Sequence, residues 1–110
     1  MADNNLRDYI SDTDTVIYEC ATQLGFALVT ESVVLASQVN GGMLAYSTSA
    51  IQGLRVLKWG GFEWRVNIGE NILASFIGEN AEREAKALWR AILSGMTGTD
   101  GSSGSLKTMA

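Results

Sequence analysis

The hydrophobic pattern after residue 53 predicts two β-strands joined by a tight turn. Gly60-Gly61 separates two runs rich in aromatic and β-branched residues, and glycine suits a two-residue hairpin loop because both central residues take positive φ. The resulting register places Trp59 opposite Phe62. Leu57 and Trp64 form the next pair on the same apolar face. We therefore expect an antiparallel sheet with one buried face.

The same register assigns the charged side chains of these two strands. Lys58, Glu63 and Arg65 fall together on the face opposite the aromatic residues, because successive side chains of a strand alternate between faces. Arg55 lies opposite Val66 on the apolar face. Lys58, Glu63 and Arg65 are therefore candidate interaction residues on an exposed surface.

A third strand follows a second turn at Gly69. A three-residue loop pairs Phe76 with Trp64, whereas a two-residue loop turns Leu73 toward the face of Trp64. We expect the three-residue loop, because it adds another aromatic pair to the apolar face.

The last apolar pattern predicts an amphipathic helix from Asn80 to Ser94. Its apolar positions recur at spacings of four, three and four residues: Ala81, Ala85, Leu88 and Ile92. This spacing is typical of a helix that packs one face on a sheet. Asn80 suits the N-cap and Gly95 the C-terminal end.

A second stripe on this helix consists of small residues, Ala87, Ala91 and Gly95. Such a stripe is compatible with a lightly covered surface. It is also compatible with close approach by another helix, including one from a second subunit, so these three residues are candidate interaction residues too.

The first part of the chain, from Leu6 to Leu24, has a helical pattern. Its apolar stripe contains Val16, Ile17, Cys20, Ala21 and Leu24. Ser11 or Asp12 suits the N-cap and Gly25 the C-terminal cap. We expect an N-terminal helix here, with Cys20 as a small hydrophobic core residue.

Residues 26–52 allow two interpretations. β-Branched residues are frequent, and Asn40-Gly41 is a strong hairpin signal, which favours strands over 26–30, 32–39 and 43–47. The alternative is a pair of helices over 31–39 and 43–52, with Asn40-Gly41 ending the first. We prefer strands, because Val33, Val34 and Val39 crowd a helix.

Composition and charge set the class of protein. The 110 residues are 46% hydrophobic and 18% charged, as in a globular domain. We expect one domain over residues 1–95 and a flexible Gly/Ser/Thr-rich tail over 96–110. The net charge of −4 argues against nucleic-acid and membrane partners, because both reward basic surfaces. We expect a cytoplasmic protein, or a virion component if it is virus-encoded.

Candidate chemistry is sparse. The sequence has no histidine and one cysteine, which excludes an internal disulfide, the usual Cys/His zinc sites and histidine-dependent triads. Acidic residues gather where helix starts and solvated faces usually carry them. We expect no catalytic, cofactor-binding or metal-binding residues, and we expect the protein not to be an enzyme.

A meander followed by a tryptophan-bearing helix resembles the pleckstrin-homology domains. The matching segment is Ala85 to Ile92 with Trp89. The resemblance implies a helix that caps an open barrel. The basic phosphoinositide-binding loop of that family is missing, so the resemblance transfers no binding residue.

The sequence therefore predicts an α+β fold with an N-terminal helix, a mostly antiparallel meander and a C-terminal helix packed on the sheet. The first functional hypothesis is a non-enzymatic protein–protein interaction or self-assembling structural subunit, with a virus- or phage-like protein as one option. The second is a module that binds a small molecule or peptide in an aromatic concavity around Trp59, Trp64 and Phe76.

Overall fold

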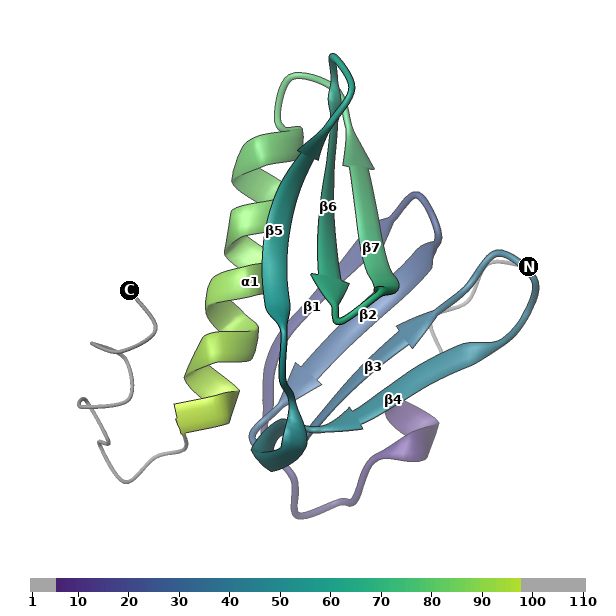
Figure 1. Ribbon diagram of the computed structural model, residues 1–110. Coiled ribbons are helices and arrows are strands. Elements are labelled where there is room, and N and C mark those ends of the chain that lie inside the picture. The colour runs from purple at the N-terminus through teal and green to yellow at the C-terminus, as the bar shows by residue number, and fades with distance from the viewer. Residues whose placement is uncertain (1–5, 98–110) are drawn as a thin grey trace.

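The computed structural model describes residues 6–97 and has an α+β architecture (Figure 1). Two short 3-10 helices, η1 (Leu6–Tyr9) and η2 (Thr48–Ala50), accompany one long helix, α1 (Ala81–Thr97). The strands are β1 (Val16–Thr22), β2 (Gly25–Thr30), β3 (Val33–Ser37), β4 (Met43–Ser47), β5 (Leu54–Trp59), β6 (Glu63–Ile68) and β7 (Asn71–Ile77). The predicted α+β class, antiparallel meander and C-terminal packed helix are confirmed.

The strands form two antiparallel sheets within the described chain. The first sheet has the order β1-β2-β3-β4 and the second the order β5-β6-β7. Each strand pairs with its neighbour in sequence, so every connection within a sheet is a hairpin. The strands preferred for residues 26–52 are confirmed, and Asn40-Gly41 lies in the β3–β4 loop. The alternative pair of helices is wrong.

The helix predicted from Leu6 to Leu24 is also wrong. This segment forms η1 and then β1, in which Cys20 pairs with Ala27 and Thr22 with Gly25. Both a helical stripe and a strand alternation fit these residues, and the β-branched and aromatic residues at 16–18 suit a strand. Pairing with β2 therefore decides the structure of β1.

Gly25 starts β2 rather than capping a helix. Its φ is +142°, and a Cβ at this position would collide with Ser37 Oγ. That hydroxyl accepts a hydrogen bond of 2.6 Å from the Phe26 backbone N–H. Glycine is required here because β3 approaches so closely.

The predicted register of the β5–β6 hairpin is wrong by one residue. Trp59 pairs with Glu63 and Lys58 with Trp64, so Gly60, Gly61 and Phe62 form a three-residue loop. The observed register places Val56 opposite Val66 and Leu54 opposite Ile68. It packs four aliphatic side chains into the shared core, with Val66 and Ile68 buried and Leu54 and Val56 partly buried, whereas the predicted register would have brought Arg55 to the apolar face.

The pairing of Phe76 with Trp64 is confirmed. The loop before β7 differs from the prediction, because β7 begins at Asn71 opposite Ile68, which leaves a two-residue turn. An irregularity between Val66 and Asn67 restores the predicted pairing further along the strand. A β-bulge of this kind has the same effect on register as one extra loop residue.

Helix α1 packs beside the second sheet and reaches the first at its C-terminal end (Figure 1). Ala85, Leu88 and Ile92 are fully buried, which confirms the predicted apolar stripe. They share one core with residues of both sheets, among them Val29, Val34, Val66, Ala74 and Phe76. The helix continues to Thr97, two residues past the expected domain end. Of the tail predicted over 96–110, residues 96 and 97 belong to α1, and residues 98–110 lie outside the described residues.

A smaller cluster covers the other face of the first sheet. Leu28 and Leu35 are buried there together with Leu6 of η1. Figure 1 shows η1 on the side of this sheet that faces away from β5–β7. The first sheet is thus packed on both faces, and η1 covers the second of them.

Candidate functional site

An exposed apolar surface lies at one end of the second sheet, beside the β5–β6 loop, where β5 and β7 end and β6 begins. Trp59, Phe62 and Ile77, which we call the aromatic patch, have exposed fractions of 52%, 76% and 54%. Trp59 and Ile77 flank Glu63 in one cross-strand row, so all three side chains share a face. The carbonyl of Phe62 accepts a hydrogen bond from the Gly78 N–H at 3.0 Å, which places the loop beside the end of β7.

A hydrogen-bonded ion pair lies within this surface. Arg65 Nε donates to Glu63 Oε2 at 2.7 Å, and Ser75 Oγ donates to the same oxygen at 2.7 Å. These hydrogen bonds, from Ser75 foremost and from Arg65, hold the pKa of Glu63 below its ordinary value. Glu63 is therefore held as a carboxylate between two strands.

The guanidinium of Arg65 also stacks on the aromatic patch. Its central carbon lies 4.3 Å from the centroid of the Trp59 ring, a cation–π geometry. Glu63 and Trp59 together orient the Arg65 side chain. The surface thus combines exposed aromatic area with a charged group whose position is already set.

The structure brings two of the predicted charged residues together and separates the third. Glu63 and Arg65 form the ion pair described above. Lys58 pairs with Trp64 across the strands and is exposed, but it lies on the opposite face of β5 from Trp59. The one-residue change of register is the reason.

The predicted aromatic concavity does not assemble. Trp64 and Phe76 lie on the face of the second sheet that packs toward the shared core, and Lys86 Nζ of α1 lies 5.4 Å from the Trp64 ring. Trp59 lies on the opposite face. Sequence reasoning therefore missed the aromatic patch, because it assigned Trp59 and Phe62 to the buried face.

The small residues of α1 serve contacts within the chain. Ala91 and Gly95 are buried, and Ala87 is half-buried. A Cβ on Gly95 would lie 2.9 Å from the Thr30 carbonyl oxygen, so glycine permits close approach of α1 to the first sheet. We therefore leave Ala87, Ala91 and Gly95 out of the interaction surface proposed below.

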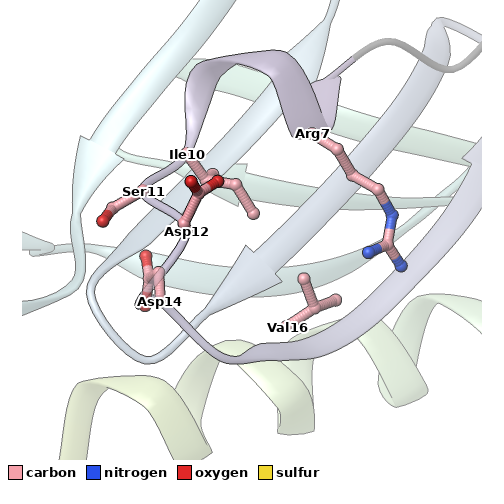
Figure 2. A pocket seen from close by; sticks show the side chains of 6 residues that line it. All are labelled: Arg7, Ile10, Ser11, Asp12, Asp14 and Val16. Atoms are coloured by element: carbon pink, nitrogen blue, oxygen red, sulfur yellow. The ribbon is translucent and has the colours of Figure 1, made fainter.

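A hollow of about 240 Å³ lies beside η1 (Figure 2). Its lining residues are Arg7, Ile10, Ser11, Asp12, Asp14 and Val16. Arg7 is on one side of the hollow, away from Asp12 and Asp14, and its guanidinium donates to Glu19 Oε1 at 2.7 Å. The only strong cation in the lining is thus already paired with a carboxylate of β1.

Asp14 holds the loop that carries η1 against the first sheet. Its Oδ2 accepts hydrogen bonds of 2.6 Å from both Thr30 Oγ1 and Ser32 Oγ. Partial burial raises the pKa of this carboxyl, but the hydrogen bonds from Ser32 and Thr30 outweigh it, so the pKa of Asp14 is lowered. These contacts give Asp14 a structural role.

Cys20 packs against the shared core from β1, as its predicted role as a small hydrophobe requires. Burial, together with the nearby Glu84 and Glu19 carboxylates, raises the pKa of the thiol to about 11. A thiol with this pKa is a weak nucleophile near neutral pH, because the thiolate is the reactive form.

Comparison of the chain with protein-family models, with curated proteins and with solved structures found no match. Within residues 6–97, no helix is long and apolar enough to cross a membrane. The same part of the chain contains no group of three or more cysteine and acidic residues placed to hold a metal ion. The aromatic patch is consequently the feature on which a function is best argued.

Proposed function

We propose that this protein is a non-enzymatic protein–protein interaction module whose contact surface is the aromatic patch with the Glu63–Arg65 pair. The observation that supports it is the exposure of Trp59 and Ile77 on a single face at one end of the second sheet, with the exposed Phe62 in the adjoining loop. Contiguous exposed apolar groups with a polar surround are typical of interaction surfaces. Tryptophan and arginine are also the residues most enriched at interface hot spots.

The geometry suits binding because the fold already restricts the charged side chains of this surface. Arg65 is held by Trp59 and Glu63, and Glu63 is held in turn by Ser75. Fixing a long side chain on binding ordinarily costs about 0.5–1.5 kcal/mol. Here the fold has already restricted Arg65, so a partner meets a surface that is partly preorganised.

The sheet behind the patch supplies rigidity. Phe76 and Val66 are buried on the reverse face, under α1, and the strands that carry Trp59 and Ile77 are each held to β6 by antiparallel pairing. Sites on strands hold their side chains more accurately than sites on loops. Only Phe62 belongs to a loop.

A paired binding experiment tests the proposal. The full chain and the variant Trp59→Ser/Ile77→Ser serve as baits in the native host, and each captured protein is then purified and titrated by isothermal calorimetry. We expect at least one partner whose affinity falls about tenfold or more in the variant, as for loss of hot-spot side chains.

The matched control is Val39→Ser/Met43→Ser, which removes exposed apolar side chains outside the patch. This control should bind like the unchanged chain. Equal affinities for the unchanged chain and for the Trp59 and Ile77 variant, across every purified partner, would refute the assignment of the patch.

A further inference from the structure

Charge is distributed unevenly between the two halves of the molecule. Residues 6–53 carry one basic side chain, Arg7, against five acidic ones and have a net charge of −4. The acidic residues are Asp8, Asp12, Asp14, Glu19 and Glu31. The first sheet, with η1 and its loop, therefore carries a net charge equal to the −4 of the whole chain.

The half that carries the aromatic patch has the opposite sign. Residues 54–78 contain Arg55, Lys58 and Arg65 against Glu63 and Glu70, a net charge of +1. Residues 79–97 balance three acidic against three basic side chains. Arg55 and Lys58 are both exposed on β5, which is an edge strand of the second sheet. Neither forms a salt bridge within residues 6–97.

We propose that the aromatic patch and the adjoining edge of β5, where Arg55 is exposed on the face of Trp59 and Lys58 on the other face, bind the acidic η1 surface of a second copy of this chain, head to tail. The inference rests on the proposed function and names its partner. Tyr9 of η1 is 62% exposed and lies between the exposed Asp8 and the exposed Asp12 in sequence. The η1 surface thus offers an aromatic group with neighbouring carboxylates to an apolar surface beside an edge strand that carries two cations, and opposite charges of this kind fix orientation in interfaces.

Charge complementarity favours this contact over a symmetric one. A two-fold contact of patch on patch would join two surfaces of the same net positive sign, without the opposite charge that the η1 surface supplies. The η1 surface and the patch lie on opposite sides of the first sheet (Figure 1), so one copy can use both at once. A head-to-tail contact of this kind extends into rings or filaments rather than stopping at a dimer.

Sedimentation velocity of the purified full chain gives the first test. From about 10 µM to about 1 mM, a range typical of weak complexes, we expect the weight-average mass to rise beyond that of a dimer. The rise should shrink at about 1 M salt, where the Debye length is only about 3 Å. A monomer throughout this range would overturn the inference.

Complementary charge reversal gives the sharper test. Variant one, Asp8→Lys/Asp12→Lys, inverts the η1 surface, and variant two, Arg55→Glu/Lys58→Glu, inverts the β5 surface. Each alone should remain monomeric, because both of its contact surfaces then carry the same sign. An equimolar mixture should assemble again, since each surface of one variant then meets its opposite on the other.

The control for variant two is Arg83→Glu/Arg90→Glu, the same charge change on the exposed side of α1. It should assemble like the unchanged chain. Circular dichroism melts verify that every variant is folded, and recovery in the mixture is itself evidence of folding. Assembly of either single variant to the wild-type extent, or no recovery in the mixture, would overturn the head-to-tail contact.

Failure of the self-association inference can be distinguished from failure of the proposed function. A purified chain that stays monomeric, together with a host partner whose affinity depends on Trp59, removes self-association and keeps the interaction module. Assembly that responds to charge but is unchanged in Trp59→Ser/Ile77→Ser removes the patch from the self-contact and overturns this inference, while the titrations with host partners still decide the proposed function.

Discussion

The two sheets of this protein differ in what covers their second face. The first sheet packs its inner face into the shared core, and η1 covers its other face through Leu6, Leu28 and Leu35. The second sheet packs one face under α1 and leaves Trp59 and Ile77 exposed on the other. A short N-terminal segment thus closes one sheet, and nothing equivalent within residues 6–97 covers Trp59 or Ile77.

This difference indicates which sheet face is available to a binding partner. A sheet face of large apolar residues is normally covered, because leaving it in water forgoes about 25 cal/mol per Å² of burial. The outer face of the second sheet has a mixed character instead, with an ion pair among its apolar groups. Such a face is compatible with exposure to water and still contains apolar area that a partner can bury.

The largest expected effect contrasts the two outer faces directly. Leu28→Ala removes a fully buried side chain from beneath η1 and should lower the free energy of unfolding by about 2–5 kcal/mol. Ile77→Ala, on the exposed face, should cost less than about 1 kcal/mol. Urea denaturation measures both. Equal costs would show that η1 does not seal the first sheet.

An intermediate effect is expected where α1 reaches the first sheet. Gly95→Ala gains about 1 kcal/mol of helix propensity, but the new Cβ would lie 2.9 Å from the Thr30 carbonyl oxygen, a backbone atom. We expect a net loss of about 1–3 kcal/mol from overpacking. Thermal melts should show this loss for Gly95→Ala and none for the exposed neighbour Ser94→Ala. Stabilisation by Gly95→Ala would contradict the close approach.

The smallest effect concerns the loop that holds η1 in place. Asp14→Asn weakens the hydrogen bonds from Thr30 and Ser32 and should cost about 1 kcal/mol near pH 7. Because the folded-state pKa of Asp14 is lowered, its contribution is present above the unfolded pKa and is lost as pH falls through the folded pKa. The difference from the unchanged chain should therefore shrink as the pH falls below the ordinary titration range of aspartate.

Urea unfolding curves at several pH values check this dependence. Asp12→Asn is the matched control, since Asp12 is an exposed neighbour and should leave stability nearly unchanged. A difference for Asp14→Asn that stays constant as the pH falls below the ordinary titration range of aspartate would show that the carboxylate charge is not what holds the loop.

Elements with strong local signals could be predicted. The apolar spacing of Ala85, Leu88 and Ile92 specifies one face of α1, and the structure buries all three. Asn40-Gly41 likewise marks the β3–β4 loop. In both cases the periodicity or the turn chemistry within about ten residues carries the information.

The register of β5 and β6 could not be predicted in the same way. Two glycines permit a two-residue loop, but the structure uses three loop residues. The deciding interaction is burial of Val56 and Val66 under α1, which belongs to another part of the chain. A shift of one residue moves every side chain of a strand to the other face. The aromatic patch was missed for this reason alone.

By itself the sequence determined the α+β class, the C-terminal helix and its buried stripe, and it favoured strands over residues 26–52, because each depends on local periodicity and turn residues. Only the tertiary structure decided that residues 16–22 form a strand, that η1 covers the first sheet, and that Trp59 faces outward while Trp64 faces the core. These features depend on pairing and burial between distant segments. Such contacts choose between alternatives that are locally almost equal in free energy.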